Sequence, residues 1–341
     1  MIKIENKGII LERTELDFEN QAVLNPGCIK IGDTVHMLYR AVHEGNLSTI
    51  GYCKLKDFKV IERLNYPVLS PEHEYEKHGL EDPRIVECEG IYYVFYSVYD
   101  GINALEAYAT TKDFKTFKKH GIISPIISYD LALEIFEKTN VPEKYVWYGR
   151  HYKESIGKNV KLWSKDMLLF PKKINGRFAM LNRVMPGMQI VYFDDFSELT
   201  NEFWINQLFE LSHSIVLDPK YWYESRKIGG GCPPLETEDG WLLIYHAVED
   251  SLSGHIYRAS AALLDKNDPG KVIARLPEPL FSPEESWEKD GDVANVVFPT
   301  AAFIDGEDLV IFYGAADRRI AAKVIKIDSL MSELKKFPVN H

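Results

Sequence analysis

The short run Glu81-Asp82-Pro83-Arg84 is the part of the sequence best suited to acid–base chemistry. It lies between a polar run and an apolar stretch with strand character. Pro83 restricts its own backbone and disfavours a helical conformation at the preceding residue, so we expect Asp82 to be extended. A surface turn closed by an Asp–Arg pair would have the same sequence. Asp82 is therefore a candidate catalytic acid only if other polar residues gather around it.

Five aromatic-rich apolar segments share one layout along the chain. They span residues 35–41, 92–98, 178–184, 241–247 and 309–315. Each follows a glycine-containing turn, a pattern typical of β-hairpins. A proline stands near the start of the strand before each hairpin, where the missing N–H is tolerated. These prolines are Pro26, Pro83, Pro171, Pro234 and Pro299.

The repeated unit predicts the fold class and the domain organisation. Further strands follow in most units, so a four-stranded unit occurs five times. Repeated four-stranded units are typical of propeller blades. We expect an all-β protein, with residues 1–341 forming a single five-bladed β-propeller domain. A pair of β-sandwiches is the alternative, although sandwiches seldom repeat one hairpin layout five times.

Several segments interrupt the repeat. Residues 128–138 predict a short amphipathic helix, and residues 141–163 are rich in Tyr, Trp, His and Lys. Together they make an insertion at about 126–164. Long connections of this kind act as lids, binding loops or subunit contacts, which is consistent with a homo-oligomer. Residues 220–227 and the glycines at 229–231 predict a second loop, and residues 329–336 predict a short C-terminal helix.

Polar residues recur at equivalent strand ends. Aligning the five segments places the following residues at one position: Arg40, Ser97, Arg183, His246 and Gly314. The opposing strand entrances contribute a second set: Asn25, Asp82, Asp166 with Lys165, and Asp317. Singly, such residues are usually solvated rim residues. In a propeller they would converge, and the cations among them would suit an anionic ligand such as phosphate.

The chemistry that fits one acid beside several cations is the cleavage of a glycosidic bond. Hydrolases of this kind use a second carboxylate to activate water. A phosphate ion is already an anionic nucleophile and needs no base. One acid facing a cationic pocket therefore favours phosphorolysis, with inorganic phosphate as co-substrate.

Composition excludes several other classes of function. The formal net charge is −11 and no basic stripe is present, which argues against nucleic acid and anionic membranes as partners. No apolar run is long enough for a membrane span, and the N-terminus lacks the pattern of a signal peptide. Four scattered cysteines predict free thiols in a reducing compartment, hence a cytoplasmic protein. We find no metal-binding, phosphate-loop or dinucleotide-binding motif, so we expect neither metal nor organic cofactor.

Several motifs occur in the order of a known family. They lie at residues 81–84, 169–183, 229–234, 240–246, 262–269 and 313–317. In these motifs the chain resembles glycoside hydrolase family 130, the β-mannoside phosphorylases and related β-mannosidases. The resemblance implies a five-bladed β-propeller. Two features depart from the family pattern: Asn182 stands where many members have His, and the 126–164 insertion is longer than expected.

The resemblance also implies roles for individual residues. Asp82 matches the general acid, and Arg183, His246, Tyr257 and Lys165 match phosphate-binding positions. Substrate-binding positions are matched or flanked by Asn25, Arg40, Glu81, Arg84, Asp166 and Asp317. Glu81 would help Asp82 to keep its proton, whereas Arg84 would oppose this if it faced Asp82.

We therefore predict inverting phosphorolysis of a β-mannosidic bond in mannobiose or manno-oligosaccharides, giving α-mannose 1-phosphate. The linkage and the acceptor sugar remain open. The first alternative is a β-mannosidase, which would need a carboxylate base such as Glu236 or Glu249. The second is a carbohydrate-binding propeller without catalysis, in which Asp82 would be a structural residue.

Overall fold

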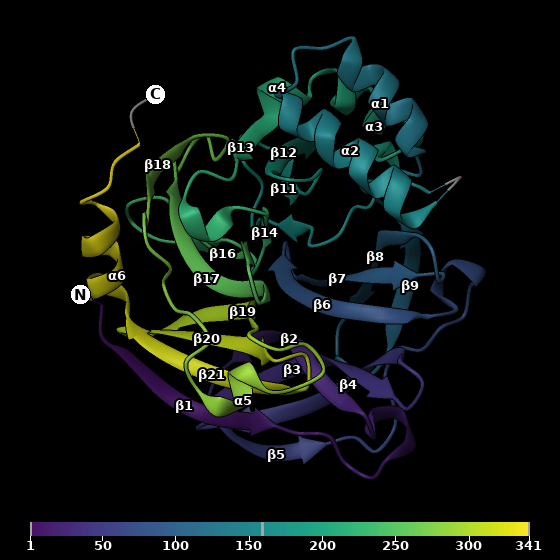
Figure 1. The fold of residues 1–341 in the computed structure, drawn as a ribbon. Coiled ribbons are helices and arrows are strands. Elements are labelled where there is room, and N and C mark those ends of the chain that lie inside the picture. Colours follow the sequence, from purple (N-terminus) through teal and green to yellow (C-terminus); the bar gives the residue numbers. More distant parts are fainter. Residues whose placement is uncertain (1, 158–159, 340–341) are drawn as a thin grey trace.

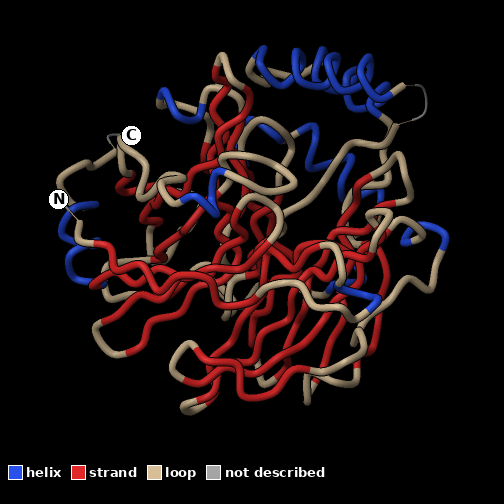
Figure 2. Tube along the Cα trace, turned by 60° about the horizontal axis from the view of Figure 1, so that its bottom comes forward, coloured by secondary structure: helices blue, strands red, loops and turns tan. Residues whose placement is uncertain are grey.

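Antiparallel strands dominate the computed structural model, which describes residues 2–157 and 160–339, and helices are few (Figure 1). In this part of the chain the strands form four hydrogen-bonded sheets. The protein is therefore all-β in class, as predicted. In Figure 2 the helices lie mainly at the margin of a body built from strands.

The largest sheet consists of two antiparallel meanders that meet at one point. The first contains β2 (Ala22–Ile31), β3 (Thr34–His43), β4 (Leu47–Lys56) and β5 (Lys59–Arg63). The second contains β6 (Gly79–Cys88), β7 (Ile91–Tyr99), β8 (Ala104–Thr111) and β9 (Phe117–Ile122). The two are connected by a single parallel pair, Ser48 with Gly79, between β4 and β6.

Each of the other three sheets contains one further meander. One is formed by β10 (Leu168–Leu169), β11 (Phe178–Asn182), β12 (Met188–Phe193) and β13 (Ile215–Leu217). The next is formed by β14 (Lys227–Gly230), β15 (Leu235–Glu236), β16 (Trp241–Ser251), β17 (Gly254–Leu264) and β18 (Val272–Arg275). The last is formed by β19 (Val297–Asp305), β20 (Asp308–Ala315), β21 (Arg319–Lys326) and β1 (Ile4–Leu11). The sequence did not predict that β1 completes the final sheet by pairing with β21.

The helices lie mostly where the repeat is interrupted. They are α1 (Tyr129–Glu137), α2 (Glu143–Ile156), α3 (Asn201–Phe209), α4 (Leu211–Ser214), α5 (Ser286–Lys289) and α6 (Ile327–Leu334). The predictions for α1 and α6 are confirmed, whereas α2 and α3 were not predicted. Ser128 begins α1 by accepting a hydrogen bond from the backbone N–H of Leu131. The prediction of a glycine loop at 229–231 was wrong for its first two residues, because Gly229 and Gly230 end strand β14.

A buried glutamate precedes the hairpin in four of the five meanders. Each is fully buried and forms an ion pair with a cation of its own meander: Glu19 with Arg63 (2.9 Å), Glu76 with Lys119 (2.8 Å), Glu224 with Arg275 (2.6 Å) and Glu288 with Lys323 (3.0 Å). Three of them also accept a hydrogen bond from a buried tyrosine hydroxyl, namely Tyr39, Tyr245 and Tyr313. The β10–β13 meander instead follows the α1–α2 insertion. These contacts anchor four meanders in the same way.

Candidate active site

Asp82 lies in a bulge of β6, where the register with β7 slips between Glu81 and Arg84. Its φ is +53°, in the left-handed region, so the expectation of an extended Asp82 was wrong. Asn25 occupies a similar bulge in β2 with φ +48°. Asn and Asp tolerate this conformation better than other residues with a side chain. The Asn25 side-chain amide donates a 2.8 Å hydrogen bond to the Asp82 carboxylate, so the two bulges meet at the site.

Glu81 connects two cations beside the candidate acid. Its carboxylate lies 3.0 Å from the Arg40 guanidinium and 2.7 Å from the Lys165 ammonium. Arg40 also approaches Asp82, at 3.7 Å. Burial raises the pKa of Glu81, but Arg40 and Lys165 outweigh it and lower this pKa to about 2. Glu81 is therefore a charged clamp between β3 and the segment before β10, and it is not a protonated neighbour of Asp82.

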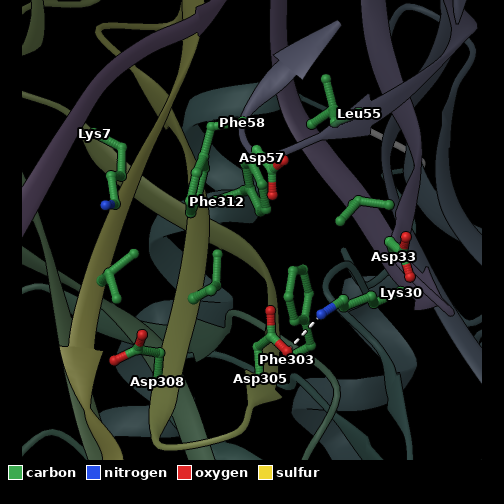
Figure 3. Close-up of a pocket in the computed structure, with 13 residues that line it drawn as sticks. Lys7, Lys30, Asp33, Leu55, Asp57, Phe58, Phe303, Asp305, Asp308 and Phe312 are labelled. Atoms are coloured by element: carbon green, nitrogen blue, oxygen red, sulfur yellow. Dashed lines mark ion pairs between the residues drawn. The ribbon is translucent and has the colours of Figure 1, made fainter. Parts of the chain in front are cut away.

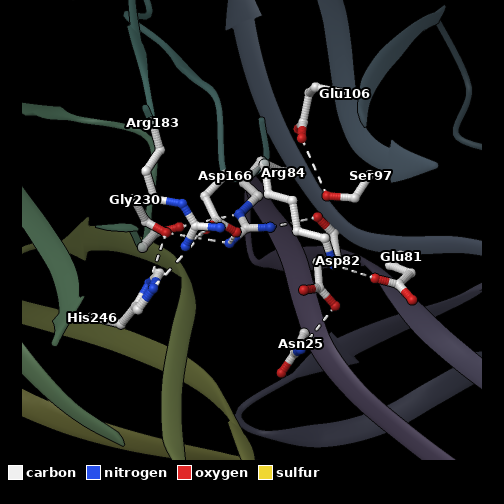
Figure 4. Close-up of polar contacts among 12 residues, drawn as sticks. Asn25, Glu81, Asp82, Arg84, Ser97, Glu106, Asp166, Arg183, Gly230 and His246 are labelled. Carbon is white, nitrogen blue, oxygen red and sulfur yellow. Dashed lines mark hydrogen bonds and ion pairs between the residues drawn. The ribbon is translucent and has the colours of Figure 1, made fainter. Parts of the chain in front are cut away.

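Asp166 is the centre of a second, fully buried charge network (Figure 4). One carboxylate oxygen lies 3.0 Å from Arg84 and the other lies 2.7 Å from Arg183. Although burial raises the pKa of Asp166, the guanidinium groups of Arg183 and Arg84 hold it well below its usual range. Arg84 also donates to the backbone carbonyl of Asp82, at 2.8 Å. It therefore faces Asp166 and the Asp82 backbone rather than the Asp82 carboxylate.

His246 stands at the far side of Asp166 and is almost fully buried. Its Nδ1 lies 3.2 Å from the carbonyl oxygen of Gly230, which makes Nδ1 the protonated nitrogen. Its Nε2 lies 4.0 Å from Asp166. Burial lowers the pKa of His246 to about 3 despite Asp166, so the imidazole is neutral near pH 7. A Cβ at Gly229 would collide with the His246 ring, so this close approach requires glycine.

These groups surround one cavity of about 170 Å³. Nine of the eleven predicted site residues line it, namely Asn25, Arg40, Asp82, Lys165, Asp166, Arg183, His246, Tyr257 and Asp317. Glu81 and Arg84 do not line it, and Arg84 has no exposed surface. Glu81 contacts Arg40 and Lys165, and Arg84 contacts Asp166, while their predicted contacts with substrate stay predictions.

Three lining residues were not predicted: Lys227, Val296 and Phe298. Lys227 is half-buried on β14 and makes no ion pair or side-chain hydrogen bond within the described residues. Burial, together with Arg183 and other cations, lowers its pKa to about 7. The Phe298 ring lies 4.5 Å from the His246 ring between centroids and gives the cavity an apolar wall. Lys227 was missed because it precedes glycines that suggested a loop.

Asp317 closes the cavity on the side of Arg40. Its backbone is left-handed, with φ +51°. Burial raises the pKa of Asp317 to about 6, with contributions from Asp82 and Glu81, although Arg40 opposes the rise. The cavity thus has two sides. Arg183, Lys227 and other donors lie on one side, and Asp82 and Asp317 lie on the other.

Comparison with known proteins agrees with this geometry. The model of glycoside hydrolase family 130, described as beta-1,4-mannooligosaccharide phosphorylase, matches residues 3–336. The chain belongs to this family. It is 33% identical over 340 residues to a 1,2-beta-oligomannan phosphorylase of Thermoanaerobacter sp. (strain X514), covering 96% of this chain and 98% of the relative. It is 34% identical over 343 residues to a beta-1,2-mannobiose phosphorylase of the same organism, covering 96% and 97%.

The fold is also similar to a solved family 130 structure. This is the beta-1,2-mannobiose phosphorylase of Listeria innocua in complex with beta-1,2-mannobiose. The TM-score is 0.74 with 24% identity, covering 98% of this chain and all of that one. At this identity the likeness supports the fold alone.

The two carboxylates suggested for a family 130 hydrolase lie elsewhere. Glu236 is exposed and pairs with Lys172 at 2.5 Å. Glu249 pairs with Arg258, also at 2.5 Å. Neither lines the cavity. Neither carboxylate is therefore placed to activate a water molecule in the cavity.

A separate hollow of about 150 Å³ lies between the first and last meanders (Figure 3). Phe58, Phe303 and Phe312 form its walls, and a Lys30–Asp305 ion pair of 2.5 Å lies at its rim. Its polar groups do not converge on one point, so it is not the candidate active site. Among the described residues there is no group of three or more His, Cys, Asp or Glu side chains that could hold a metal ion. Over the same residues, none of the helices has the length and apolar character needed to cross a membrane.

Proposed function

We propose that the protein is an inverting phosphorylase that cleaves the terminal bond of a β-1,2-linked mannoside. Its products would be α-mannose 1-phosphate and a sugar shortened by one unit. The β-1,2 linkage follows the names of the two full-length relatives, which are phosphorylases of β-1,2-mannosides. The observation that carries the proposal is a cationic side of the cavity whose one carboxylate, Asp166, is already paired with two arginines.

Phosphate would bind on this cationic side. Arg183 offers its remaining N–H groups, and Lys227 offers an ammonium that has no partner among the described residues. The Lys165 ammonium donates one of its three N–H groups to Glu81, so the other two can donate to phosphate. Neutral His246 would accept a hydrogen bond at Nε2 from the P–OH group, and Tyr257 would donate its hydroxyl. A phosphate oxygen held there can attack the anomeric carbon without a protein base.

Asp82 would supply the proton on the opposite side. As the bond between the anomeric carbon and the leaving oxygen breaks, this proton passes to the leaving oxygen, directly or through a sugar hydroxyl. A new carbon–oxygen bond to phosphate forms on the other face, which inverts the configuration. Monohydrogen phosphate loses its proton in the reaction, and that proton restores Asp82. Asn25, Arg40 and Asp317 would hold the mannosyl unit, with Phe298 against its apolar face.

The fold proposal is a single domain in the form of a five-bladed β-propeller. Each of the five antiparallel meanders would be one blade, and their arrangement in Figure 1 supports this. The buried glutamates before four hairpins support the same repeat. Pairing of β1 with β21 would close the ring, as joining both chain ends in one blade does in propellers. A homo-oligomer and a cytoplasmic location stay predictions, the latter supported by four buried free cysteines.

The test is an incubation with β-1,2- and β-1,4-mannobiose, with and without inorganic phosphate, followed by assay of mannose 1-phosphate and free mannose. We expect mannose 1-phosphate only when phosphate is present, with β-1,2-mannobiose as the faster substrate. The Asp82→Asn variant should fold normally and form no product. Equal release of free mannose without phosphate would overturn phosphorolysis. Near-normal turnover by Asp82→Asn would overturn the assignment of the acid.

A further inference from the structure

The α1–α2 insertion reaches the phosphate side of the site through Tyr145 of α2 (Figure 1). This side chain has no exposed surface, and its hydroxyl lies beside the turn that connects β11 with β12. Arg183 begins this turn. A Cβ at Gly187, at the other end of the turn, would collide with the Tyr145 hydroxyl. The turn therefore leaves room for this hydroxyl, although Tyr145 does not line the cavity.

Gln189 connects the Tyr145 hydroxyl to the backbone next to Arg183. Its side-chain amide donates to the hydroxyl at 3.2 Å and to the Val184 carbonyl at 3.0 Å, which uses both amide N–H groups. Its amide oxygen accepts a 2.6 Å hydrogen bond from the Val184 N–H. One buried side chain therefore binds both backbone polar groups of the residue after Arg183, and Tyr145 holds that side chain in place.

A carboxylate and a lysine hold Tyr145 in turn. The hydroxyl donates to the Asp218 carboxylate at 2.6 Å, and the Lys144 ammonium lies 2.8 Å from the other carboxylate oxygen. Burial and the nearby Asp218 raise the pKa of Tyr145 well above its usual range, so the hydroxyl keeps its proton. Tyrosine, carboxylate and cation are also the three groups that anchor the meanders of Arg40 and His246. The insertion therefore supplies to the β10–β13 meander what a buried glutamate supplies to the others.

We propose that Tyr145 and Gln189 are positioning residues for phosphate, which act by fixing the backbone from which Arg183 projects. The inference rests on the proposed function and adds two residues that touch neither substrate. Asp166 holds the Arg183 guanidinium at 2.7 Å, and Gln189 holds the main chain behind it. Without the Tyr145 hydroxyl, the Gln189 amide loses a partner and can rotate away from Val184. Arg183 then shifts relative to phosphate, whereas the groups on the sugar side keep their places.

The experiment measures the KM for phosphate and the KM for β-1,2-mannobiose in Tyr145→Phe, which removes only the hydroxyl. The loss of one hydrogen bond in the network predicts a KM for phosphate about three- to tenfold higher, with kcat and the KM for mannobiose changed by less than about twofold. The matched control is Tyr129→Phe. Tyr129 is also a buried tyrosine of the insertion, and its hydroxyl accepts a 3.3 Å hydrogen bond from the Trp163 N–H. The control should lose a similar amount of thermal stability and keep the wild-type KM for phosphate.

A second variant removes the link itself. Gln189→Met keeps a similar volume and removes all three hydrogen bonds, so it should raise the KM for phosphate at least as much as Tyr145→Phe. An unchanged KM for phosphate in Tyr145→Phe would overturn the positioning role and leave phosphorolysis intact. An equal rise in the KM for mannobiose, or an equal rise in the control, would do the same because it would show general loosening.

The proposed function can fail without deciding this inference. If the wild type releases free mannose without phosphate, phosphorolysis is overturned, and the affinity for inorganic phosphate is then measured by calorimetry. Weaker phosphate binding in Tyr145→Phe than in Tyr129→Phe would support the positioning role. Equal phosphate binding by the two variants would overturn it.

Discussion

Replacing Lys227 with methionine tests the cationic side of the cavity directly. Methionine keeps most of the volume of the side chain and removes the ammonium. A hydrogen bond that involves a charged group contributes about 1.5–3 kcal/mol, which predicts a KM for phosphate about 10- to 150-fold higher. At saturating phosphate we expect kcat for the mannoside to change little. The control is Lys59→Met on β5, whose lysine is exposed and does not line the cavity.

The lowered pKa of Lys227, about 7 in the free protein, adds a pH dependence with a definite sign. Below pH 7 the ammonium is present and an anion binds tightly. Above pH 7 the lysine loses its proton, so affinity for an anion should fall by up to tenfold for each pH unit. Phosphate itself changes charge in this range, so sulfate is the better probe. Its inhibition constant, measured against phosphate from pH 6.5 to 9, should rise above pH 7 in the wild type.

The Lys227→Met variant should bind sulfate weakly and with no rise of this kind. His246 does not titrate in this window because its pKa is lowered to about 3. An unchanged KM for phosphate in Lys227→Met, or the same pH curve for sulfate in both proteins, would refute the assignment. The result distinguishes the contribution of Lys227 to anion binding from that of Lys165, because the Lys165 ammonium also donates to Glu81.

Three further perturbations test the charges around the site. Glu81→Gln removes the buried carboxylate that two partly exposed cations share, so we expect a loss of about 1.5–3 kcal/mol of unfolding free energy, measured in urea and partly restored by phosphate. Burial raises the pKa of Glu106 to about 8, so its contribution to stability is present below about pH 4.5 and is lost as pH rises through 8. Glu106→Gln should therefore raise the melting temperature at pH 8–9 and leave it unchanged near pH 4, and an equal shift at both would contradict this. Glu224→Gln breaks the anchor of the β14–β18 meander and should cost about 3–5 kcal/mol in urea unfolding while raising the KM for phosphate.

The repeat in the sequence was enough to bring most of the site together. Equivalent strand ends were aligned by turns and prolines alone, and strand register then fixes which side chains share a face. This is why Arg40, Arg183 and His246 were found together with Asp82. The local conformation of Asp82 was wrong because the preference of a residue before proline is weak. A bulge that pairs with a neighbouring strand outweighs it.

Long-range pairing explains what the sequence did not reveal. Strand β1 has no distinctive pattern of its own, and its role depends on β21 at the other end of the chain. The buried glutamates were missed because each lies in or beside a short turn and becomes an anchor only through a cation tens of residues away. Helix α2 lies in a segment read only as aromatic, where helical and other structures are hard to distinguish.

The glutamate anchors also explain how the site residues keep their orientation. Two of the three anchored tyrosines stand immediately before a residue that lines the cavity, Tyr39 before Arg40 and Tyr245 before His246, whereas Tyr313 precedes Gly314. Neighbouring strand residues point to opposite faces. A hydroxyl bonded to a buried glutamate on one face therefore directs the next side chain to the other face, into the cavity. The β10–β13 meander lacks this anchor among the described residues, and it has Asn182 in place of the tyrosine before Arg183.

The backbone at the cavity is strained at several positions. Four polar residues that line it have left-handed backbones, namely Asn25, Asp82, Asp166 and Asp317. Such a conformation costs about 1–2 kcal/mol for each residue and persists only where the surroundings fix it. Asn25 and Asp82 lie in bulges of paired strands, and Asp166 is held by its ion pairs with Arg84 and Arg183. Arg183 has no tyrosine of this kind behind it, and its orientation depends instead on the 2.7 Å pair with Asp166. Removing the Asp166 carboxylate should therefore disturb Arg183 more than removing any single anchor disturbs Arg40 or His246.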